Sequence, residues 1–363
     1  MIIEHLSLLD FRNASNSEIE FDSGINVICG SNAAGKTNIL EAIFYFASGK
    51  SFRNCKDREM IRFGCDKSNI AMRFSNGKAV KKMTATLSKG GRRVIRIGES
   101  MPLRMAEYIG QFRAVIFTPD HLSLVKGSPE NRRRFLDLAI CQSFPRYAPT
   151  LSEYNRVLAQ KNALLKKGNV NDDLLAVYND RLAVLAGIIT INRKKYVTKL
   201  EEEAKRFLFD MSDGKEELSI HFQTQAGDFE TQEELRDQYK ELFEKKAYYE
   251  KERFISQYGA QKDDFTVYIN KKSAKMYGSQ GQQRSVVLAL KLAEGELSSK
   301  LTGDYPVFLL DDILSELDKD RKEYILSRIT DRQVIITGCE SEIFKTENAK
   351  RILVRNGEIQ TIN

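Results

Sequence analysis

The chain has 363 residues, of which 42% are hydrophobic and 29% are charged, and its net charge is +7. These values are typical of a globular protein of roughly two domains rather than of a disordered or fibrous chain. The longest apolar run, which lies between Arg181 and Arg193, is shorter than the about 20 residues that a membrane span needs. Acidic residues at positions 4 and 10 occur before the apolar region of a signal peptide could form, so we expect neither a membrane helix nor a secretory signal.

Cysteine and histidine are used sparsely. The five cysteines include no C-x-x-C pair, and the three histidines are spread along the chain. This pattern argues against a disulfide framework and a zinc site, and it predicts reduced thiols in a cytoplasmic protein.

Charge is distributed unevenly. Residues 50–105 contain 15 Lys and Arg against 4 Asp and Glu, whereas residues 201–254 contain 9 basic and 16 acidic residues. A basic region attracts nucleic acid or another polyanion, although a solvated face without a partner has the same composition. No aromatic residue lies between Phe74 and Tyr108, which favours phosphate contacts with a duplex over base stacking. The predicted DNA-binding residues are Lys81, Lys82, Lys89, Arg92, Arg93, Arg132, Arg133 and Arg134.

The N-terminal region predicts strands around one helix. Apolar runs at 2–8, 19–21 and 25–29 are typical of strands, and the last of them leads into a glycine-bounded loop. Apolar residues then recur with helical spacing over 39–46. Residues 69–74, 83–87 and 94–97 predict antiparallel strands, with a turn at 89–91 before the last one.

From Ser128 onward the pattern changes to helices. Ser128 and Pro129 begin a predicted helix that runs to about 143, and further helices are predicted at 150–167, 171–209 and 231–257. The helix at 171–209 is long for a globular protein and indicates a coiled-coil-like arm. Strands are predicted at 218–222, 265–269, 307–310, 333–337 and 351–355. We therefore expect an α/β domain in two parts, 1–125 and 258–363, around a helical insert at 126–257.

A phosphate-binding loop is predicted between the strand at 25–29 and the next helix. Its residues match G-x-x-x-x-G-K-[ST]: Gly30, Ser31, Asn32, Ala33, Ala34, Gly35, Lys36 and Thr37. The glycines let N–H groups point at phosphate oxygens, and the helix N-terminus adds a favourable dipole. Lys36 would place its charge on the β- and γ-phosphates as a catalytic residue, and the Thr37 hydroxyl would ligate Mg²⁺. The loop predicts ATP and Mg²⁺ as cofactors.

Two carboxylates follow the predicted strand at 307–310. Carboxylates at the end of a buried strand can hold a metal ion and a water molecule beside a phosphate-binding loop. Asp311 would reach the metal through water, and Asp312 would orient or deprotonate the hydrolytic water.

A second anion site is predicted at the start of the helix that follows Gly278. Ser279, Gln280, Gly281 and Gln282 place a serine hydroxyl and free N–H groups at a helix N-terminus. Because a long insert separates this site from the phosphate-binding loop, each site would serve a nucleotide that another copy of the chain holds. An ordinary helix cap has the same residues.

The order of these motifs resembles the ABC-type ATPase heads of the SMC class, and more closely the RecF family of bacterial recombination mediators. The segments that resemble RecF proteins are spread over nearly the whole chain: Phe11–Asn13, Phe117–Asp120, Val125–Pro129, Arg132–Asp137, Asp263-Asp264, Ser279–Arg284 and Leu309–Asp318. The resemblance implies an α/β fold, a P-loop ABC-type ATPase head with an inserted helical lever-arm domain. It also implies that Arg12 and Asn13 take part in nucleotide binding and that Ser315 and Asp318 belong to a D-loop.

The resemblance also implies a mechanism. Two chains would close on two ATP molecules, each ATP lying between the phosphate-binding loop of one chain and the signature Ser279–Gln282 of the other. DNA, gapped or double-stranded, would lie between the heads, and weak, DNA-stimulated hydrolysis would release it. The partners implied are RecR, together with RecO, in the loading of RecA during recombinational repair and replication restart.

The sequence departs from the family pattern at a few positions. Residues 259–262 read Gly-Ala-Gln-Lys where RecF proteins usually have Gly-Pro-His-Arg, and Gly278 replaces a serine. Thr337 and Gly338 stand where transporter ATPases have a switch histidine, and Gln111 is the candidate for a Q-loop. Two other classes share the P-loop and the signature: a transporter-type ABC ATPase subunit and an SMC-like structural head. A transporter subunit should have the switch histidine, and an SMC-like head should have a much longer coiled coil.

Overall fold

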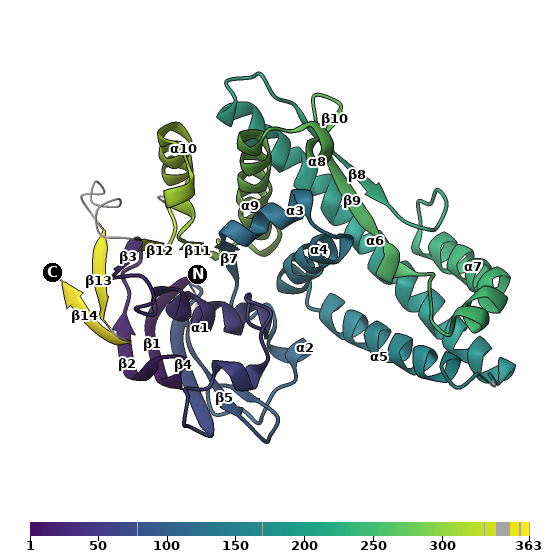
Figure 1. Ribbon diagram of the computed structural model, residues 1–363, viewed down its shortest axis with the longest axis horizontal. Coiled ribbons are helices and arrows are strands. Elements are labelled where there is room, and N and C mark those ends of the chain that lie inside the picture. Colours follow the sequence, from purple (N-terminus) through teal and green to yellow (C-terminus); the bar gives the residue numbers. More distant parts are fainter. Residues whose placement is uncertain (78, 169, 330, 339–348, 356, 363) are drawn as a thin grey trace. The chain divides into compact units, whose positions relative to one another are not determined.

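The computed structural model describes residues 1–77, 79–168, 170–329, 331–338, 349–355 and 357–362. The chain divides into two compact units (Figure 1). Unit 1 comprises residues 1–121 and 291–363, and unit 2 comprises residues 122–290. The boundaries differ from the predicted ones because residues 258–290 belong to unit 2, where β9 (Asp264–Ile269) pairs with β8 (Leu218–Gln223) over its whole length.

Unit 1 contains a mainly parallel sheet in the order β14-β13-β3-β12-β11-β7. Adjacent strands are parallel except β13 and β14, which are antiparallel. β3, β7, β11 and β12 are almost wholly buried, as is typical of central parallel strands. The strands are β3 (Ile25–Cys29), β7 (Ala114–Phe117), β11 (Val307–Asp311), β12 (Val334–Gly338), β13 (Lys350–Arg355) and β14 (Glu358–Ile362).

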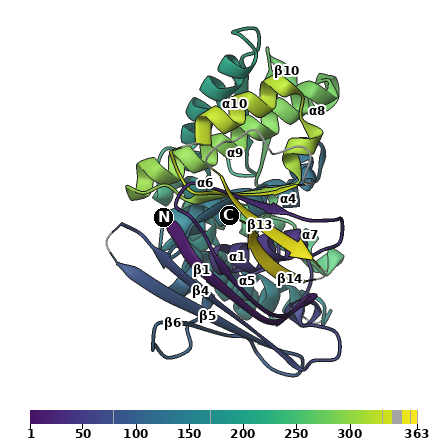
Figure 2. The ribbon, with the colours of Figure 1, turned by 90° about the vertical axis from the view of Figure 1, so that its left-hand side faces the viewer.

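A second, antiparallel sheet in unit 1 has the order β2-β1-β4-β5-β6 (Figure 2). Burial alternates along β4 and β5, so one face of this sheet is solvated. The strands are β1 (Ile2–Phe11), β2 (Ala14–Glu20), β4 (Lys67–Ser75), β5 (Val80–Ser88) and β6 (Val94–Ile97). Unit 1 also contains α1 (Lys36–Ser48), α2 (Met105–Tyr108) and α10 (Lys319–Ile329), and 3-10 turns at Asp57–Met60 and Ile313–Glu316. A further 3-10 turn, Pro119–Leu122, spans the boundary between the units.

Unit 2 is built around one long helix, α6 (Asp172–Met211), which packs on α4, α5, α7 and β8. Its length and composition would suit a membrane span, but 56% of its most apolar window is buried inside the unit, as in a core helix. The remaining elements are α3 (Ser123–Lys126), α4 (Pro129–Ser143), α5 (Tyr147–Leu165), α7 (Gln232–Arg253), a 3-10 turn at Ala260–Lys262, β10 (Lys272–Ser273) and α8 (Ala274–Tyr277). α9 (Gln280–Thr302) runs from unit 2 into unit 1.

Candidate nucleotide-binding site

The phosphate-binding loop joins β3 to α1. Gly30 has φ +153° and Gly35 has φ +116°, values that favour glycine. A Cβ on Gly30 would lie 2.3 Å from the carbonyl oxygen of Val354, and one on Gly35 would lie 2.7 Å from Oδ1 of Asn13. The fold therefore requires glycine at both positions, independently of any phosphate. The rest of the motif, Ser31 to Ala34, forms the turn between them, and Lys36 begins α1.

Lys36 is held inside this loop. Its side chain is buried, and its ammonium group donates to the carbonyl oxygens of Gly30 at 2.7 Å and Ser31 at 3.2 Å. An ammonium group has three donors, so one remains for a phosphate oxygen. The loop thus fixes the position of the positive charge.

Thr37 and Asp311 are adjacent although 274 residues separate them in the sequence. The Thr37 hydroxyl donates to Oδ1 of Asp311 at 2.8 Å. Thr337 lies opposite Asp311 in the parallel pairing of β11 and β12, and its hydroxyl donates to the same Oδ1 at 2.9 Å. The backbone N–H of Asp312 in turn donates to the Thr337 hydroxyl at 3.0 Å. The carboxyl end of β11 is therefore joined directly to the first turn of α1.

The environment of Asp311 suits a cation. Burial raises the pKa of this carboxyl, and the hydrogen bonds from Thr37 and Thr337 offset only part of that rise. The charged carboxylate is therefore not fully stabilised by its surroundings. Hydroxyl and carboxylate oxygens are the ligands that Mg²⁺ prefers, and it takes few of them from protein. Within the described ranges, no group of three His, Cys, Asp or Glu side chains could hold a metal. Thr37 and Asp311 therefore fit a Mg²⁺ ion that also binds nucleotide phosphates.

Asp312 and the segment after it form a compact turn. Asp312 has a left-handed backbone with φ +50°, which ends β11 and leads into the 3-10 turn at Ile313–Glu316. The Ser315 hydroxyl donates to the carbonyl oxygen of Asp312 at 2.7 Å. Asp318 caps α10 by accepting from the N–H of Arg321 at 3.0 Å, and this hydrogen bond lowers its pKa. Of the two predicted D-loop residues, Ser315 thus lies on this turn and Asp318 lies at the start of the helix that follows it.

Arg12 and Asn13 support the phosphate-binding loop and its helix. Arg12 donates to both carboxylate oxygens of Glu41, a fully buried residue of α1, at 2.6 and 2.8 Å. Asn13 donates to the carbonyl oxygen of Ala34 at 2.9 Å and accepts from Asn38 at 2.8 Å. Asn13 therefore contacts the loop itself, whereas Arg12 contacts the helix that follows the loop.

The predicted signature lies in unit 2. The Ser279 hydroxyl accepts from the N–H of Gln282 at 3.2 Å, and the Gln282 side chain accepts from the N–H of Ser279 at 2.8 Å. This reciprocal pair is a capping box that begins α9 at Gln280. Ser279 and Gln280 are exposed, and Gly281 is half-buried. The signature is therefore an ordered, accessible helix start.

The predicted DNA-binding residues of the β5–β6 hairpin fall into an exposed group and an inward-facing group, according to the face of the strand on which each side chain lies. Alternate residues of a strand face opposite sides, and Met83, Ala85 and Leu87 are the buried side of β5. Lys82 lies on the solvent face with Arg96 of β6, and Lys89 and Arg92 are exposed in the connecting turn. These cations are accessible to a polyanion.

Arg93 and Lys81 face inward instead. Arg93 lies over the ring of Tyr45 and donates to the carbonyl oxygen of Gly49 at the end of α1. Lys81 donates to Gln111 at 3.0 Å, so the candidate Q-loop glutamine is already bonded to a strand of its own unit. Both residues face inward because successive side chains of a strand point to opposite faces, and these two lie on the face of the buried side chains.

The arginine cluster at 132–134 is mostly structural. Arg132 is buried and binds both carboxylate oxygens of Asp264, at 2.7 and 2.9 Å. Arg133 donates to the carbonyl oxygen of Asp263 at 2.9 Å, and Arg134 is exposed. We therefore leave Arg93, Arg132 and Arg133 out of the proposed DNA interface, since their guanidinium groups are engaged within the fold.

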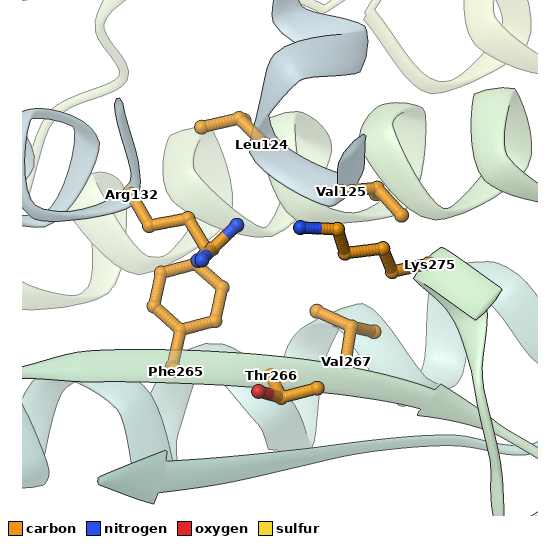
Figure 3. A pocket seen from close by; sticks show the side chains of 7 residues that line it. All are labelled: Leu124, Val125, Arg132, Phe265, Thr266, Val267 and Lys275. Carbon is orange, nitrogen blue, oxygen red and sulfur yellow. The ribbon is translucent and has the colours of Figure 1, made fainter. Parts of the chain in front are cut away.

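A small cavity in unit 2 lies between α3, β9 and α8 (Figure 3). Its volume of about 30 Å³ has room for a water molecule or two. Arg132 and Lys275 both reach toward it over the side chains of Phe265 and Val267. Because Arg132 is already paired with Asp264, we assign no ligand to this cavity.

Three residues of the site were not predicted from the sequence: Thr337, Glu41 and Arg53. Arg53 lies 3.6 Å from the Glu41 carboxylate and donates to Asn38 at 2.9 Å. The position of Thr337 at the end of a predicted strand was a usable signal, because neighbouring parallel strands end at the same edge of a sheet. Glu41 and Arg53 carried no such signal, because their pairing depends on tertiary packing.

Comparisons with known proteins find relatives that match nearly the whole chain. The family model described as RecF/RecN/SMC N terminal domain matches residues 2–360. The chain is 37% identical to the DNA replication and repair protein RecF of Clostridium perfringens over 99% of this chain and 100% of that one. It is 38% identical to the RecF protein of Clostridium kluyveri, with both chains fully covered. A solved structure of the recombination mediator RecF-ATP in the RecFOR pathway is 31% identical, with a TM-score of 0.94 over 100% of this chain and 98% of that chain.

The fold and the site define an ABC-type P-loop ATPase head with an inserted helical domain. The chain belongs to the RecF family, as the resemblance in the sequence predicted.

Proposed function

We propose that this chain is an ATP-dependent DNA-binding protein of replication and recombinational repair, in which ATP hydrolysis acts as a switch. The observation that carries the proposal is the 2.8 Å contact between Thr37 and Asp311, which brings the P-loop and the carboxylate strand into one site. The names of the relatives, DNA replication and repair protein RecF, support the biological setting.

ATP would bind with its phosphates on the loop at 30–37. Lys36 supplies a fixed positive charge, and the N-terminus of α1 supplies N–H groups and a favourable dipole. Thr37 and Asp311 would hold Mg²⁺, which neutralises charge on the β- and γ-phosphates when it is bound. A solved RecF relative with ATP supports ATP as the nucleotide.

Hydrolysis would depend on Asp312. A water oxygen attacks the γ-phosphorus, the bond from that phosphorus to the β–γ bridging oxygen breaks, and ADP leaves. The Asp312 carboxylate orients this water and accepts its proton. Because Asp312 lies on the same turn as Ser315, hydrolysis and the state of the D-loop would be coupled.

ATP would also join two chains. Ser279 is exposed at an ordered helix start, where its hydroxyl and nearby N–H groups can bind the γ-phosphate of an ATP held by a second copy. DNA would bind to this ATP-bound homodimer through Lys82, Lys89, Arg92 and Arg96, and hydrolysis would release it. RecR and RecO would be the partners in loading RecA, and the cytoplasm the location.

The test is ATP-dependent DNA binding by two variants. Lys36→Met removes a charge-assisted contact, which contributes about 1.5–3 kcal/mol, so we expect a roughly ten- to hundredfold loss of ATP affinity. Asp312→Asn keeps Asp311 and Thr37, so it should bind ATP and remain a DNA-bound dimer because turnover stops. Calorimetry and sedimentation measure these effects.

Lys50→Met is the matched control, since Lys50 is exposed just beyond α1. Normal ATP binding by Lys36→Met would contradict the site. Unchanged turnover by Asp312→Asn would contradict its role.

A further inference from the structure

Glu216 lies outside the motifs identified in the sequence, yet its carboxylate contacts the signature. It stands in the turn between α6 and β8, and its Oε1 accepts from the side-chain amide of Gln282 at 2.9 Å. Both residues are half-buried and belong to unit 2. They are 66 residues apart in the sequence, so the contact is set by the fold of this unit.

The side-chain amide of Gln282 is bonded at both ends. Its oxygen accepts from the N–H of Ser279 at 2.8 Å, and its NH₂ group donates to Glu216. The two ends of an amide are not equivalent, because only the oxygen accepts hydrogen bonds. An amide rotated by half a turn would place its NH₂ group against the N–H of Ser279, and both contacts would be lost. Glu216 therefore fixes the orientation in which Gln282 caps the start of α9.

This cap determines which donors remain at the helix start. The Ser279 oxygen accepts from the N–H of Gln282 at 3.2 Å, and among the contacts of the described residues its own proton is donated to no group of this chain. The hydroxyl therefore keeps a donor for an external oxygen. The N–H groups of Gln280 and Gly281 belong to the first turn of α9 and have no partner within the helix. One O–H and two N–H donors are thus available to an anion.

The capping residue is a glutamine, although capping boxes also use glutamate. A carboxylate at position 282 would repel a phosphate that approaches the same helix start. A neutral amide avoids this repulsion, but its NH₂ group needs an acceptor, which Glu216 provides from the turn between α6 and β8. The pair of residues thus completes the cap while position 282 stays uncharged.

The turn that carries Glu216 is itself fixed. The N–H of Glu216 donates to the hydroxyl of Ser212, just after α6, at 3.0 Å. Asn270, which follows β9, donates to the carbonyl oxygen of Lys215 at 3.1 Å and accepts from the N–H of Glu217 at 2.8 Å. The turn is therefore bonded to both the long helix and the sheet of unit 2. A carboxylate on a fixed support can hold Gln282 at a small entropic cost.

We propose that Glu216 is a positioning residue of the ATP site that two chains share. It acts through Gln282 to keep the donors of Ser279 and α9 arranged for the γ-phosphate of an ATP held by the second chain. The proposal rests on the proposed ATP-driven dimer and adds to it a residue from outside the signature. Because Glu216 lies in the turn after α6, it also links the signature to the core helix of unit 2.

The test compares variants of the full chain by sedimentation with Mg²⁺ and a slowly hydrolysed ATP analogue. Glu216→Ala removes the acceptor, and one hydrogen bond corresponds to about a two- to tenfold change in an equilibrium constant. A dimer contains two such sites, so the association constant should fall by about four- to hundredfold. Glu216→Gln keeps an acceptor oxygen and should associate like the parent. Binding of ADP, which lacks the γ-phosphate, should be the same in every variant.

Glu217→Ala is the matched control, because it removes the same charge from the same turn, where the Glu217 carboxylate pairs with Lys205. It should associate like the parent. Gln282→Ala should also weaken association. Adding Glu216→Ala to Gln282→Ala should cause no further loss, because the two residues act through one contact.

Parental association of Glu216→Ala would overturn the proposal. An equal loss in Glu216→Gln or Glu217→Ala would overturn it as well, by tracing the effect to the charge of the turn. A further loss on adding Glu216→Ala to Gln282→Ala would show that Glu216 does not act through Gln282. If the parent does not associate with the ATP analogue, the proposed dimer itself fails.

Discussion

Without a bound cation, the charged carboxylate of Asp311 lowers the free energy of unfolding. It is 7% exposed at the end of β11, and Asp312 adds a second negative charge beside it. Burial raises its pKa in the folded chain above the ordinary value of 3.8. The folded state therefore binds this proton more tightly than the unfolded chain does. As pH rises from 3.8 through the raised pKa, ionisation of Asp311 lowers the free energy of unfolding.

Asp311→Asn should remove this cost. The amide oxygen can still accept from Thr37 and Thr337, and no charge is buried. At neutral pH and without ligand we expect the variant to unfold at the same or a higher temperature than the parent. The difference should shrink as pH falls toward 3.8, where the parent carboxyl is protonated.

With Mg²⁺ and ATP bound, the parent should unfold at a higher temperature than Asp311→Asn. A ligand that binds the folded state raises its stability by RT ln(1 + [L]/Kd), and the variant lacks the carboxylate that attracts the ion. Thermal unfolding at pH 5 and 7.5, with and without Mg²⁺-ATP, measures both effects. A ligand-free variant clearly less stable than the parent at neutral pH would show that the hydrogen bonds outweigh the burial cost.

At the residue scale, local motifs were predictable and tertiary partners were not. The loop at 30–37 and Asp311 could be identified because their chemistry requires a fixed spacing or a strand end. The inward orientation of Lys81 and Arg93 could also have been predicted. Every second side chain of a strand lies on the same face, and this spacing puts both residues on the face of buried side chains. The buried pairing of Glu41 with Arg12 could not be predicted. A carboxylate on a helix is normally solvated, and only folding brings Arg12 to it.

At the scale of elements, most predicted strands and helices lie within a few residues of the observed ones. The strands β7, β10 and β14 were not predicted because each is short, and the helix α10 was not predicted because it is largely polar. The coiled-coil-like arm predicted for 171–209 corresponds to α6. Instead of pairing with one helix, α6 forms the core of unit 2 and packs on several elements. Its many apolar positions need contacts on more than one side of the helix.

The hairpin of β5 and β6 gives a prediction for DNA binding. Replacing Lys82, Lys89, Arg92 and Arg96 by alanine removes four exposed charges from one element. Each phosphate contact contributes about 0.9 to the slope of log affinity against log salt on B-DNA, so the slope should flatten by up to about 3.6. ATP binding should stay unchanged, because none of these residues contacts the phosphate-binding loop in the described contacts. Salt titrations of duplex binding measure the slope.

The control removes the same number of charges from unit 2. Lys205, Lys215, Lys240 and Lys245 are all more than half exposed and lie in the acidic region. Their replacement by alanine should leave the salt slope unchanged. Equal slopes for the hairpin variant and the parent would show that the hairpin is only a solvated sheet edge, and Arg134 would remain as the exposed candidate.

At the scale of the whole molecule, the sequence predicts an insert but not its limits. The chain leaves unit 1 after residue 121 and returns within α9, at residue 291. A continuous helix gives no composition change at a boundary, so the return point is invisible to sequence patterns. The pairing of β9 with β8, which are 40 residues apart, decides that the signature belongs to unit 2.

The proposed ATP sites combine the phosphate-binding loop of one chain with Ser279 of another, and this can be tested in mixtures. Lys36→Met lacks a working loop and keeps Ser279. Ser279→Arg keeps the loop but presents a bulky side chain to the γ-phosphate, so it should bind ATP as a monomer without dimerising. Loss of the Ser279 cap should cost only about 1 kcal/mol, which thermal unfolding can verify.

Each variant alone should be inactive, and the mixture should regain activity. A mixed dimer has one site with an intact loop and an intact Ser279, whereas its other site has neither. Random pairing makes half of the dimers mixed, so up to about a quarter of the parental sites should be complete. ATP hydrolysis and sedimentation of the mixture measure this recovery. The control is a mixture of Ser279→Arg with the double variant Lys36→Met, Ser279→Arg, which contains no intact Ser279 and should stay inactive. If the first mixture recovers neither association nor hydrolysis although both variants fold, Ser279 does not act on the nucleotide of a second chain.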